Sequence, residues 1–487
     1  FNVQQVPFYR LAHDAVRSGS FLWNWETDLG VNFIGSYSFY LLFSPFFWLT
    51  LPFPSWMVPY LMGPLLMLKI ACMGLTAYFY LRRFVRDDRY AVFGSMLYAF
   101  SGFTVYNIFF NHFLDVMVFF PLMLIALEEL VEHGRKGVFA LAVFLNAIVN
   151  YWFFIGEVVF VVLYVFIRWL SPGWNMNLKK FFLIALESIL GVGLAAAVLI
   201  PSVLAILGNP RTTADNLLSG WNFWFYSNSE RIPAIIQSFL FPPELPSRPN
   251  FFPNHGAKWS SLAAWLPLVS MSGVLAFVLT KRRHWLKRMI CVLFFMALFP
   301  GLNSIFIALN NSYYTRWFYM LVLLMALATI IALERREIPL GRGFTWTAFL
   351  TVFIIAAVGL TPVKTVEGDT ATWSLGLEAY PDRFWIYSLI AVLSLVLTYL
   401  LIRRRRSPGF LRSMTVACSF IIVTSSLTFL GYGMAHSNWP SYIIGTGIEG
   451  RQKLDLPDEG FVRSDFYEAM DNMGMFLGLP NIQAFHS

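Results

Sequence analysis

A short polar turn between two apolar runs carries the residue types best suited to acid–base chemistry. The sequence NHFLD places Asn111, His112 and Asp115 between a run that ends near residue 110 and one that begins near residue 117. A carboxylate beside a membrane cavity can have a raised pKa and act as a base. The alternative is a solvated acid that the dipole at the start of a helix stabilises. We therefore take Asp115 as the candidate catalytic residue and His112 as a candidate substrate-binding residue.

Three basic residues outside the apolar runs have the chemistry to bind an anion. Arg316 lies in NNSYYTRWFYM and is followed by Trp317, and Arg211 and Lys258 lie at the two ends of the polar stretch 208–258. A guanidinium binds a phosphate through two parallel hydrogen bonds. Each of these side chains could equally extend to lipid headgroups. We carry the three basic residues and Trp317 forward as candidate substrate-binding residues.

Three ionisable residues lie inside the apolar runs themselves. Glu157 stands in NYWFFIGEVVF, near one end of a run, whereas Lys69 and Glu187 lie deeper in theirs. An unpaired carboxylate in an apolar environment is costly or becomes neutral, so Glu157 needs a partner or a wet cavity. We take Glu157 as a substrate-binding candidate. For Lys69 and Glu187 we favour a structural pair within the membrane.

The composition indicates what kind of scaffold must hold these residues. Of the 487 residues, 57% are hydrophobic and 13% are charged, which is about half the charged fraction of a soluble domain. Apolar runs long enough to cross a hydrocarbon core of about 30 Å recur along the whole chain. Reading the runs against their charged breaks predicts an all-α polytopic membrane fold with twelve spans. The predicted spans are residues 55–81, 91–110, 117–131, 138–152, 156–168, 181–207, 261–280, 289–309, 317–333, 344–361, 384–402 and 413–432.

The breaks between the predicted spans alternate in charge. One set of short breaks holds 22 Lys and Arg residues, and the opposite set, which is much longer in total, holds 12. Short basic loops face the cytoplasm. The formal net charge of +8 is therefore a sign of membrane orientation, and it gives no reason to expect nucleic acid as a partner. Because the polar candidates lie in the less basic set, we predict a multi-pass plasma-membrane protein whose site faces the extracellular side.

The topology divides the chain into five parts. We expect a first extracellular loop with amphipathic or re-entrant helices, an N-terminal membrane bundle, a long extracellular loop, a C-terminal membrane bundle, and the start of an extracellular C-terminal domain. Each bundle should hold about six spans. Because the first loop is predicted to lie outside, we also expect a membrane helix before this chain. The predicted bounds of the five parts are 1–54, 55–207, 208–260, 261–432 and 433–487.

Several cofactor signatures are missing from the sequence. It contains no GxxxxGK[ST], no GxGxxG after a predicted strand and no HExxH, which removes the motif-based case for ATP hydrolysis, a nicotinamide cofactor or zinc. The three cysteines lack ligand spacing, and we interpret them as buried apolar residues. No cofactor is therefore predicted, although a divalent metal is left open. The cysteines are Cys72, Cys291 and Cys418.

In five segments the sequence resembles the bacterial YfhO family. The segments are QQVPFYRLAHDAVRSGSFLWNWETDLGVNFIGSYSFYLLFSPF near the start, LYAFSGF (97–103), DVMVFFPLMLIALEEL (115–130), LIPSVLAILGNPRTT (199–213) and YYTRWFYM (313–320). The resemblance runs in order over nearly the whole chain. It implies a fold like the GT-C class of polytopic glycosyltransferases, and it implies sugar addition to lipoteichoic acid or related surface polymers of Gram-positive bacteria.

The resemblance also implies a donor and a set of site residues. Such enzymes use a sugar on undecaprenyl phosphate at the outer membrane face, with an acid near the acceptor hydroxyl and cations near the lipid phosphate. The second-loop acid of the family corresponds to Asp115, and the first-loop acid is expected just before Phe1. Arg316 and Arg211 would bind the phosphate. The predicted sugar pocket is lined by Gln4, Gln5, Trp23 and Asn24.

The implied partners are the lipid-linked donor, an extracellular polymer acceptor, the bilayer and the membrane enzyme that makes the donor. Two other functions stay open. A transporter or flippase of a lipid-linked envelope precursor would show internal repeats and broken midplane helices. We see no repeated half, and the polar candidates gather at the outer face, which favours an enzyme. A non-catalytic scaffold for envelope assembly would be favoured if no acid precedes Phe1.

Overall fold

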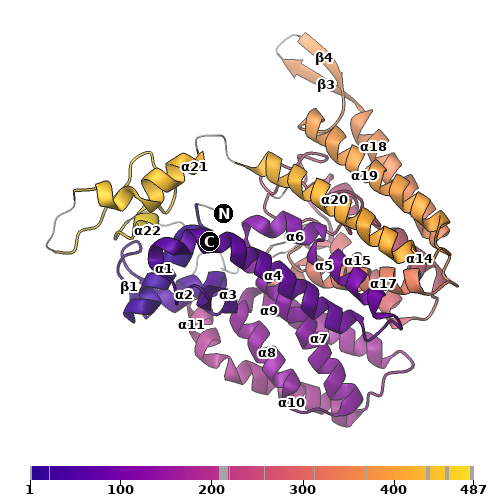
Figure 1. The fold of residues 1–487 in the computed structure, drawn as a ribbon, viewed down its shortest axis with the longest axis horizontal. Coiled ribbons are helices and arrows are strands. Elements are labelled where there is room, and N and C mark those ends of the chain that lie inside the picture. The colour runs from indigo at the N-terminus through magenta and orange to yellow at the C-terminus, as the bar shows by residue number, and fades with distance from the viewer. Residues whose placement is uncertain are drawn as a thin grey trace.

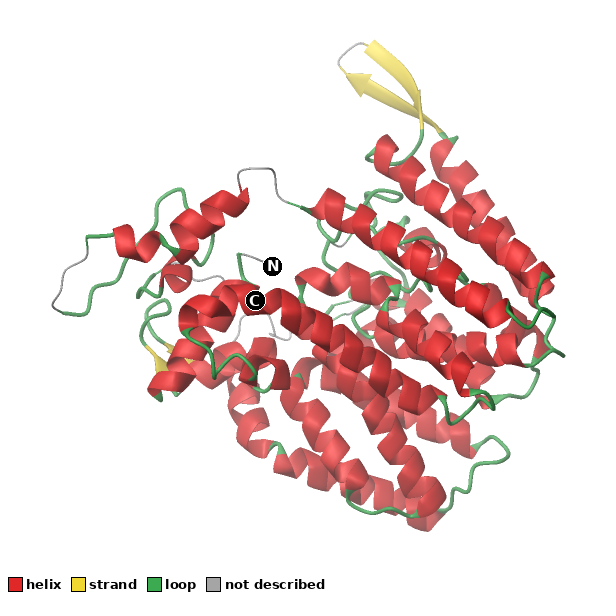
Figure 2. Cartoon of the chain, viewed as in Figure 1, coloured by secondary structure: helices red, strands yellow, loops and turns green. Residues whose placement is uncertain are grey.

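The chain folds into a bundle of helices with a smaller part beside it at one end (Figures 1 and 2). We call this smaller part, which lies outside the bundle, the external part. The computed structural model describes residues 3–20, 22–207, 218, 220–256, 258–311, 313–367, 370–434, 439–455 and 460–482. Within these residues, six helices are long and apolar enough to cross a membrane, or up to eight if each of two bent pairs is one span. The two sheets are two-stranded antiparallel hairpins. The predicted all-α polytopic fold is therefore confirmed.

The first half of the bundle begins with the helix that follows the external N-terminal region. Its elements are α4 (Val58–Leu81), α5 (Asp88–Ala99), α6 (Gly102–Tyr106), η3 (Asn107–Phe109), η4 (Asn111–Phe113), α7 (Asp115–His133), α8 (Val138–Val149), α9 (Tyr151–Trp169), α10 (Leu178–Leu194) and α11 (Ala196–Leu207).

The second half includes one of the two hairpins, which projects from the bundle between two long helices (Figure 1). Its elements are α12 (Trp221–Trp224), α13 (Arg231–Leu240), α14 (Ser272–Thr280), α15 (Trp285–Leu298), α16 (Pro300–Ser304), η7 (Ile305–Ile307), α17 (Phe318–Glu334), α18 (Leu340–Gly359), β3 (Pro362–Glu367), β4 (Thr370–Leu375), α19 (Pro381–Arg403) and α20 (Phe410–Gly433).

Each of the twelve predicted spans contains a helix, but the described residues hold only six helices, or up to eight, that are long and apolar enough to cross a membrane, so the predicted number of twelve spans is not reached. Three of the predicted runs are also interrupted. The run 181–207 is bent by 74° between α10 and α11, and the run 289–309 is bent by 108° between α15 and α16. Pro300 opens α16, and because proline has no N–H it cannot continue the hydrogen bonding of α15. The run 261–280 was predicted as one span, which is wrong for its first half. Positive φ angles at Ser261, Leu268 and Ser270 interrupt the backbone there, so only α14 is helical.

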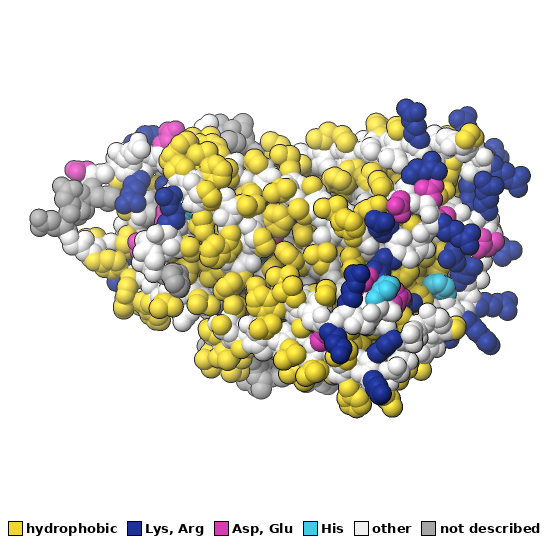
Figure 3. Space-filling model, turned by 60° about the horizontal axis from the view of Figure 1, so that its bottom comes forward, with side chains coloured by type: hydrophobic (Ala, Val, Ile, Leu, Met, Phe, Trp, Pro, Cys, Tyr) yellow, Lys and Arg dark blue, Asp and Glu magenta, His cyan; other side chains and the backbone are white. Residues whose placement is uncertain are grey.

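The loops of the more basic set lie together at one end of the bundle. Figure 3 shows most Lys and Arg side chains at that end and hydrophobic side chains over the middle. Hydrogen bonds and ion pairs join loops that are far apart in the sequence. These contacts are Arg83 with Glu129 and Glu132, the Arg86 N–H with Glu334, Lys281 with Glu337, Arg288 with the Leu170 carbonyl, and Arg405 with the Ile338 carbonyl. The alternation of charge along the sequence thus corresponds to two physical ends.

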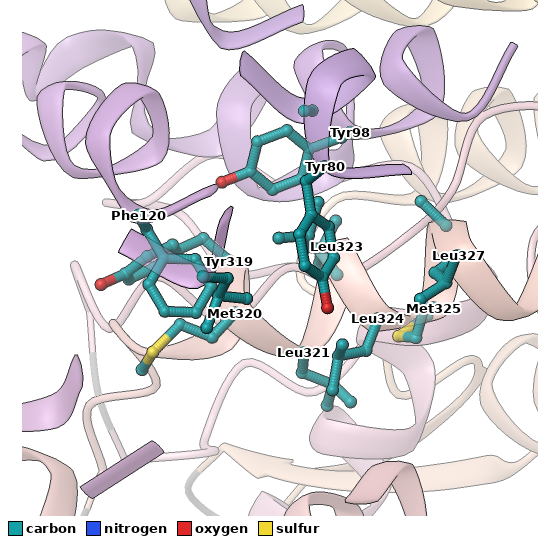
Figure 4. Packing of buried hydrophobic residues seen from close by; sticks show 14 of the residues in the cluster. Tyr80, Tyr98, Phe120, Tyr319, Met320, Leu321, Leu323, Leu324, Met325 and Leu327 are labelled. Atoms are coloured by element: carbon teal, nitrogen blue, oxygen red, sulfur yellow. The ribbon is translucent and has the colours of Figure 1, made fainter. Parts of the chain in front are cut away.

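Helix α17 forms the centre of the bundle. No residue from Phe318 to Leu333 is more than 4% exposed, although this helix is shorter than the outer ones. Figure 4 shows Tyr80 of α4, Tyr98 of α5 and Phe120 of α7 packed around it. A helix that is apolar on every side is buried by its neighbours rather than by lipid. The turn that precedes α17, which carries Arg316, is therefore held by the core.

The external part combines the two ends of the chain. The N-terminal region packs against the C-terminal segment in one hydrophobic cluster that includes Phe8 and Phe476. Arg10 donates a hydrogen bond to the Phe476 carbonyl at 2.6 Å, and the Asn472 amide donates to the Val3 carbonyl at 2.9 Å. The elements are α1 (Gln5–Ser18), β1 (Trp23–Asn24), β2 (Val31–Asn32), α2 (Phe33–Tyr37), η1 (Ser38–Leu42), α3 (Pro45–Trp48), η2 (Ser55–Met57), α21 (Trp439–Tyr442), η8 (Ile443–Ile448), η9 (Gly450–Lys453) and α22 (Met473–Leu477).

The close crossing of α14 and α18 gives a test of the fold. A Cβ at Gly343 would lie 2.1 Å from the Ser272 carbonyl oxygen and 2.4 Å from the Ala276 nitrogen, whereas a Cβ at Gly341 meets nothing within 4 Å. We expect Gly343→Ala to force the two backbones apart and to destabilise the protein by at least about 1 kcal/mol. The measurement is the midpoint of thermal unfolding in lipid nanodiscs. Gly341→Ala, on the same helix, is the control. Equal midpoints for the two variants would contradict this packing.

Candidate functional site

A buried ion pair between α4 and α7 lies at the end of the bundle opposite the basic loops. Lys69 Nζ is 2.7 Å from Asp115 Oδ1, 2.8 Å from the Asn111 carbonyl oxygen and 2.9 Å from Asn111 Oδ1. The two charged side chains are 0% and 2% exposed. The ammonium group has three hydrogens, and three oxygen atoms surround it. The predicted pairing of Lys69 with Glu187 is wrong, because Glu187 instead accepts hydrogen bonds from backbone N–H groups at the start of α8.

The same turn is fastened to the external N-terminal region. Asn111 Nδ2 donates to the Tyr9 hydroxyl at 2.9 Å, and Tyr9 lies on α1. Tyr9 and Ser44 both lie close to the Asp115 carboxyl group. The start of α7 supplies free backbone N–H groups that favour a carboxylate at this position. Asp115 therefore sits where the membrane bundle and α1 meet.

His112 lies between the ion pair and the next cation. Its Nδ1 is 3.2 Å from Gln5 Oε1, and Gln5 in turn donates to Gln4 Oε1 at 3.1 Å. Because an amide oxygen can only accept, Nδ1 carries the proton and Nε2 is left as an acceptor. No hydrogen-bond partner of Nε2 occurs in the described part of the chain. Burial, followed by the charges of Arg316 and Lys69, lowers the pKa of His112 well below its usual value, so the ring is neutral at pH 7.

Arg316 is held by aromatic rings and not by an acid. Its guanidinium lies 4.1 Å from the Tyr314 ring centre and 4.8 Å from the Phe113 ring centre. Among the described residues it forms no ion pair, and its buried Nε has no hydrogen-bond partner. A guanidinium in this setting keeps its charge and its donors for an anion. We call Lys69, Asn111, His112, Asp115 and Arg316 the rim cluster.

A second buried arginine positions the turn that carries Arg316. Arg231, at the start of α13, is fully buried and donates through Nη2 to the Tyr313 carbonyl. Its Nη1 is 3.4 Å from His255 Nδ1. Tyr106 is close enough to the guanidinium groups of Arg231 and Arg316 to interact electrostatically with both. Sequence reasoning did not single out Arg231, because its neighbours come from segments that are distant in the sequence.

The segment around Lys258 covers the rim cluster from the second half of the chain. Lys258 itself is exposed, and the ring of the next residue, Trp259, lies 5.5 Å from Phe110. The Ser260 carbonyl accepts a hydrogen bond from the Thr315 N–H at 2.8 Å. Lys258 therefore stands at the rim beside the turns that carry His112 and Arg316.

The space at the rim cluster is narrow in this conformation. A pocket of about 10 Å³ lies between α9 and Arg316, with Phe153, Trp317 and Tyr319 in its walls. This volume is that of about one water molecule. A phosphate group at Arg316 therefore requires movement of the side chains around it.

Two further candidates, Trp317 and Glu157, form hydrogen bonds with other residues of the bundle. Trp317 is 2% exposed, stacks on Phe306 and donates its indole N–H to Asn303, which are packing contacts. Glu157 lies one helical turn beyond Phe153, and its Oε1 accepts a hydrogen bond from the Tyr319 hydroxyl at 2.7 Å.

The four predicted sugar-pocket residues do not form one pocket. Gln4 and Gln5 lie by His112, whereas Trp23 and Asn24 line a separate cavity of about 710 Å³ at the external part. Arg211 lies outside the described residues. No group of three His, Cys, Asp or Glu residues that could hold a metal ion occurs within the described ranges.

Comparisons with known proteins bear on both fold and family. Residues 1–487 match the model of a family described as bacterial membrane protein YfhO. The chain is 25% identical over 265 residues to the "Uncharacterized protein YfhO" of Bacillus subtilis (strain 168). That match covers 49% of this chain and 30% of the relative, so the chain spans less than a third of the relative's length.

Two crystal structures of ArnT from Cupriavidus metallidurans are similar in fold. One is bound to undecaprenyl phosphate and the other is in the apo state. Both give a TM-score of 0.51 and cover 98% of this chain and 80% of ArnT, at 13% and 14% sequence identity respectively. This likeness shows a shared fold, the GT-C fold of ArnT.

The electrostatic link between His112 and Arg316 gives a test of the site. Because the charge of Arg316 is one cause of the lowered pKa of His112, removing it in Arg316→Ala should raise that pKa. The measurement is an NMR titration of protein labelled at histidine Cε1, with the His112 signal assigned through His112→Gln. Arg248→Ala, which removes an exposed arginine of the long loop, should leave the titration unchanged. An unaltered His112 titration in Arg316→Ala would contradict the electrostatic interaction between the two residues.

Proposed function

Because the chain belongs to the YfhO family of bacterial membrane proteins and shares the fold of ArnT, we propose that it is a membrane glycosyltransferase. It transfers a monosaccharide from an undecaprenyl-phosphate-linked donor to an extracellular acceptor. The acceptor is lipoteichoic acid or another cell-envelope polymer. The observation that carries the proposal is the rim cluster, where His112 lies within reach of the charges of both Arg316, which has no acid partner among the described residues, and the buried pair of Lys69 with Asp115.

The proposed reaction is a substitution at the anomeric carbon of the donor sugar. An acceptor oxygen forms a bond to that carbon while the bond from the carbon to the phosphate oxygen breaks, and the electron pair leaves with the lipid phosphate. The proton of the acceptor hydroxyl must be taken up as the new bond forms. A site for this reaction needs a proton acceptor and a cation placed near the leaving oxygen.

Arg316 supplies the cation in this proposal. Its guanidinium is pre-positioned by the rings of Tyr314 and Phe113, so it can bind the phosphate through two N–H groups without first breaking an ion pair. Lys258, exposed at the rim, adds positive charge that attracts the lipid headgroup. Lys69 is less suitable for phosphate binding, because its three donors already face three oxygen atoms.

His112 and Asp115 have different roles in the proposed reaction: one accepts the proton and the other positions the turn. The neutral His112 ring leaves Nε2 free to accept a hydrogen bond, and then a proton, from the acceptor hydroxyl. Asp115 is almost fully buried and neutralised by Lys69. We therefore assign Asp115 a positioning role, in which its ion pair with Lys69 keeps the turn of His112 in place. The proton of the acceptor hydroxyl moves to His112. The Gln4 and Gln5 amides orient the imidazole.

The role of Asp115 in sugar transfer can be separated from its role in folding. Asp115→Asn leaves Lys69 as an uncompensated buried charge, which costs about 3–5 kcal/mol in comparable pairs. Because the turn that carries His112 would shift, transfer should fall at least about tenfold. The double variant Lys69→Met/Asp115→Leu removes both charges, so it should regain thermal stability without regaining transfer. The measurements are thermal unfolding and transfer of a radiolabelled sugar from purified lipid-linked donor in nanodiscs. Full transfer by the double variant would show that the pair is structural only.

The role of Arg316 predicts a change in donor affinity. Loss of a hydrogen-bonded charge typically costs about 1.5–3 kcal/mol, so Arg316→Ala should raise KM for the lipid-linked donor by about tenfold to a hundredfold. Arg316→Lys should recover only part of this, because an ammonium lacks the planar fork that stacks on Tyr314. Arg248→Ala is the matched control. An unchanged donor KM in Arg316→Ala would exclude Arg316 as the phosphate ligand. The acceptor itself is identified by compositional analysis of surface polymers with and without the gene.

A further inference from the structure

A second cavity lies in the external part, well away from the rim cluster. Its volume is about 710 Å³, within the range of about 300–1,000 Å³ that is typical of ligand pockets. The polar and aromatic residues in its wall are Asp14, Trp23, Asn24, Trp25, Glu26 and Arg463. We call this space the outer cavity.

The outer cavity is formed by both ends of the chain. One wall is the end of α1 and the hairpin of β1 and β2, and the other comes from the segment that contains Arg463. The Glu26 carbonyl accepts a hydrogen bond from the Asn481 N–H at 2.9 Å. Arg463 donates to the backbone carbonyls of Asp28 and Trp25 at 3.1 and 3.4 Å. These bonds hold the hairpin against the C-terminal segment.

The hairpin presents two indole rings. Trp23 and Trp25 are 47% and 59% exposed, and their ring centres are 5.7 Å apart in an edge-to-face arrangement. Gly30, with φ of 112°, permits this arrangement: a Cβ there would lie 2.9 Å from Trp23 Nε1 and 3.0 Å from Trp25 Cε3. The Thr27 hydroxyl is 3.1 Å from the Tyr37 hydroxyl, which anchors the hairpin to α2. The two exposed aromatic rings are thus fixed in place.

The outer cavity has more carboxylates in its wall than the rim cluster has. The cavity wall carries two carboxylates, Asp14 and Glu26, and one guanidinium, Arg463, two of whose N–H groups donate to backbone carbonyls. The charge of Arg451 also acts on Glu26. The Glu26 carboxylate has no hydrogen-bond or ion-pair partner in the described part of the chain. Carboxylates accept hydrogen bonds from hydroxyl and ammonium groups, and they repel phosphates. The unpartnered Glu26 carboxylate therefore favours a hydroxyl-rich ligand over a phosphate in its part of the cavity.

We propose that the outer cavity binds a phosphate-free saccharide portion of the acceptor polymer, with Trp23 and Trp25 packing on sugar rings and Glu26 accepting hydrogen bonds from their hydroxyl groups. This inference rests on the proposed function. Helix α1 joins the two places, because Gln5 contacts His112 and Asp14 lines the cavity. Nine residues of α-helix separate them by about 14 Å at about 1.5 Å per residue. The cavity thus holds the acceptor at one position while its growing end reaches the rim cluster.

The test is direct binding to the full chain in nanodiscs that contain no sugar-based detergent. The probes are chitotriose, maltotriose, gentiobiose and a short glycerol phosphate oligomer, followed by saturation-transfer NMR and tryptophan fluorescence. At least one neutral oligosaccharide should bind saturably. Trp23→Ala and Trp25→Ala should each weaken it by at least tenfold, Glu26→Gln severalfold, and Trp23→Phe should retain most of the affinity. Trp221→Ala, which removes an exposed indole outside the cavity, is the control.

Three outcomes would overturn the inference: no saturable binding by any neutral probe, equal affinity in the Trp23 and Trp25 variants, or binding of the glycerol phosphate oligomer alone. The inference and the proposed function can fail separately. If the wild-type protein binds sugar through Trp23 but transfers none, the proposed function fails and the binding site remains. If the wild-type protein transfers sugar, and Trp23→Ala changes neither sugar binding nor the acceptor KM, the outer cavity loses its role.

Discussion

The arrangement of the external end depends on one buried ion pair, Lys69 with Asp115. A lysine in the middle of an apolar helix is stable only if its charge is matched and its donors are satisfied. Here Asp115 supplies the charge, and Asn111 supplies two further oxygen atoms. Meeting this requirement fixes the turn between η4 and α7 against α4. It also fixes Asn111, whose amide reaches Tyr9 and thereby places α1 on the bundle.

The position of α1 then determines both external sites. Its first turn brings Gln5 to His112, and its last turns form part of the outer cavity. The C-terminal segment docks on the same helix through the Arg10 hydrogen bond to Phe476 and the surrounding apolar cluster. A chain of contacts therefore runs from a membrane-embedded charge to a cavity outside the bundle. The buried pair is better understood as an organising element than as a source of net stability, since apolar residues of similar size often stabilise a core as well.

Much of the fold could be predicted from the sequence, because membrane spans follow from length, apolarity and loop charge. The breaks in the runs 181–207 and 289–309 could not, since their apolar composition is continuous across the bend. The first half of the run 261–280 is apolar as well, and its positive φ angles leave no hydrophobic pattern. The placement of Asp115, His112 and Arg316 near one rim followed from topology alone. The partner of Lys69 could not be predicted in this way, because hydropathy gives the depth of a residue in the membrane but not the rotation of its helix.

The rim cluster and the outer cavity differ in the charged side chains that they contain and in the surroundings of those side chains. A buried arginine without an acid, such as Arg316, is unfavourable unless aromatic rings and an incoming anion compensate its charge. In the outer cavity, which is open to water, partial burial and then the charge of Asp14 raise the pKa of Glu26. Under the proposed function, an anion site at the rim cluster and carboxylates in the outer cavity direct a lipid phosphate to the first site rather than the second. Under the same proposal, donor and acceptor are bound by different side chains and do not compete for them.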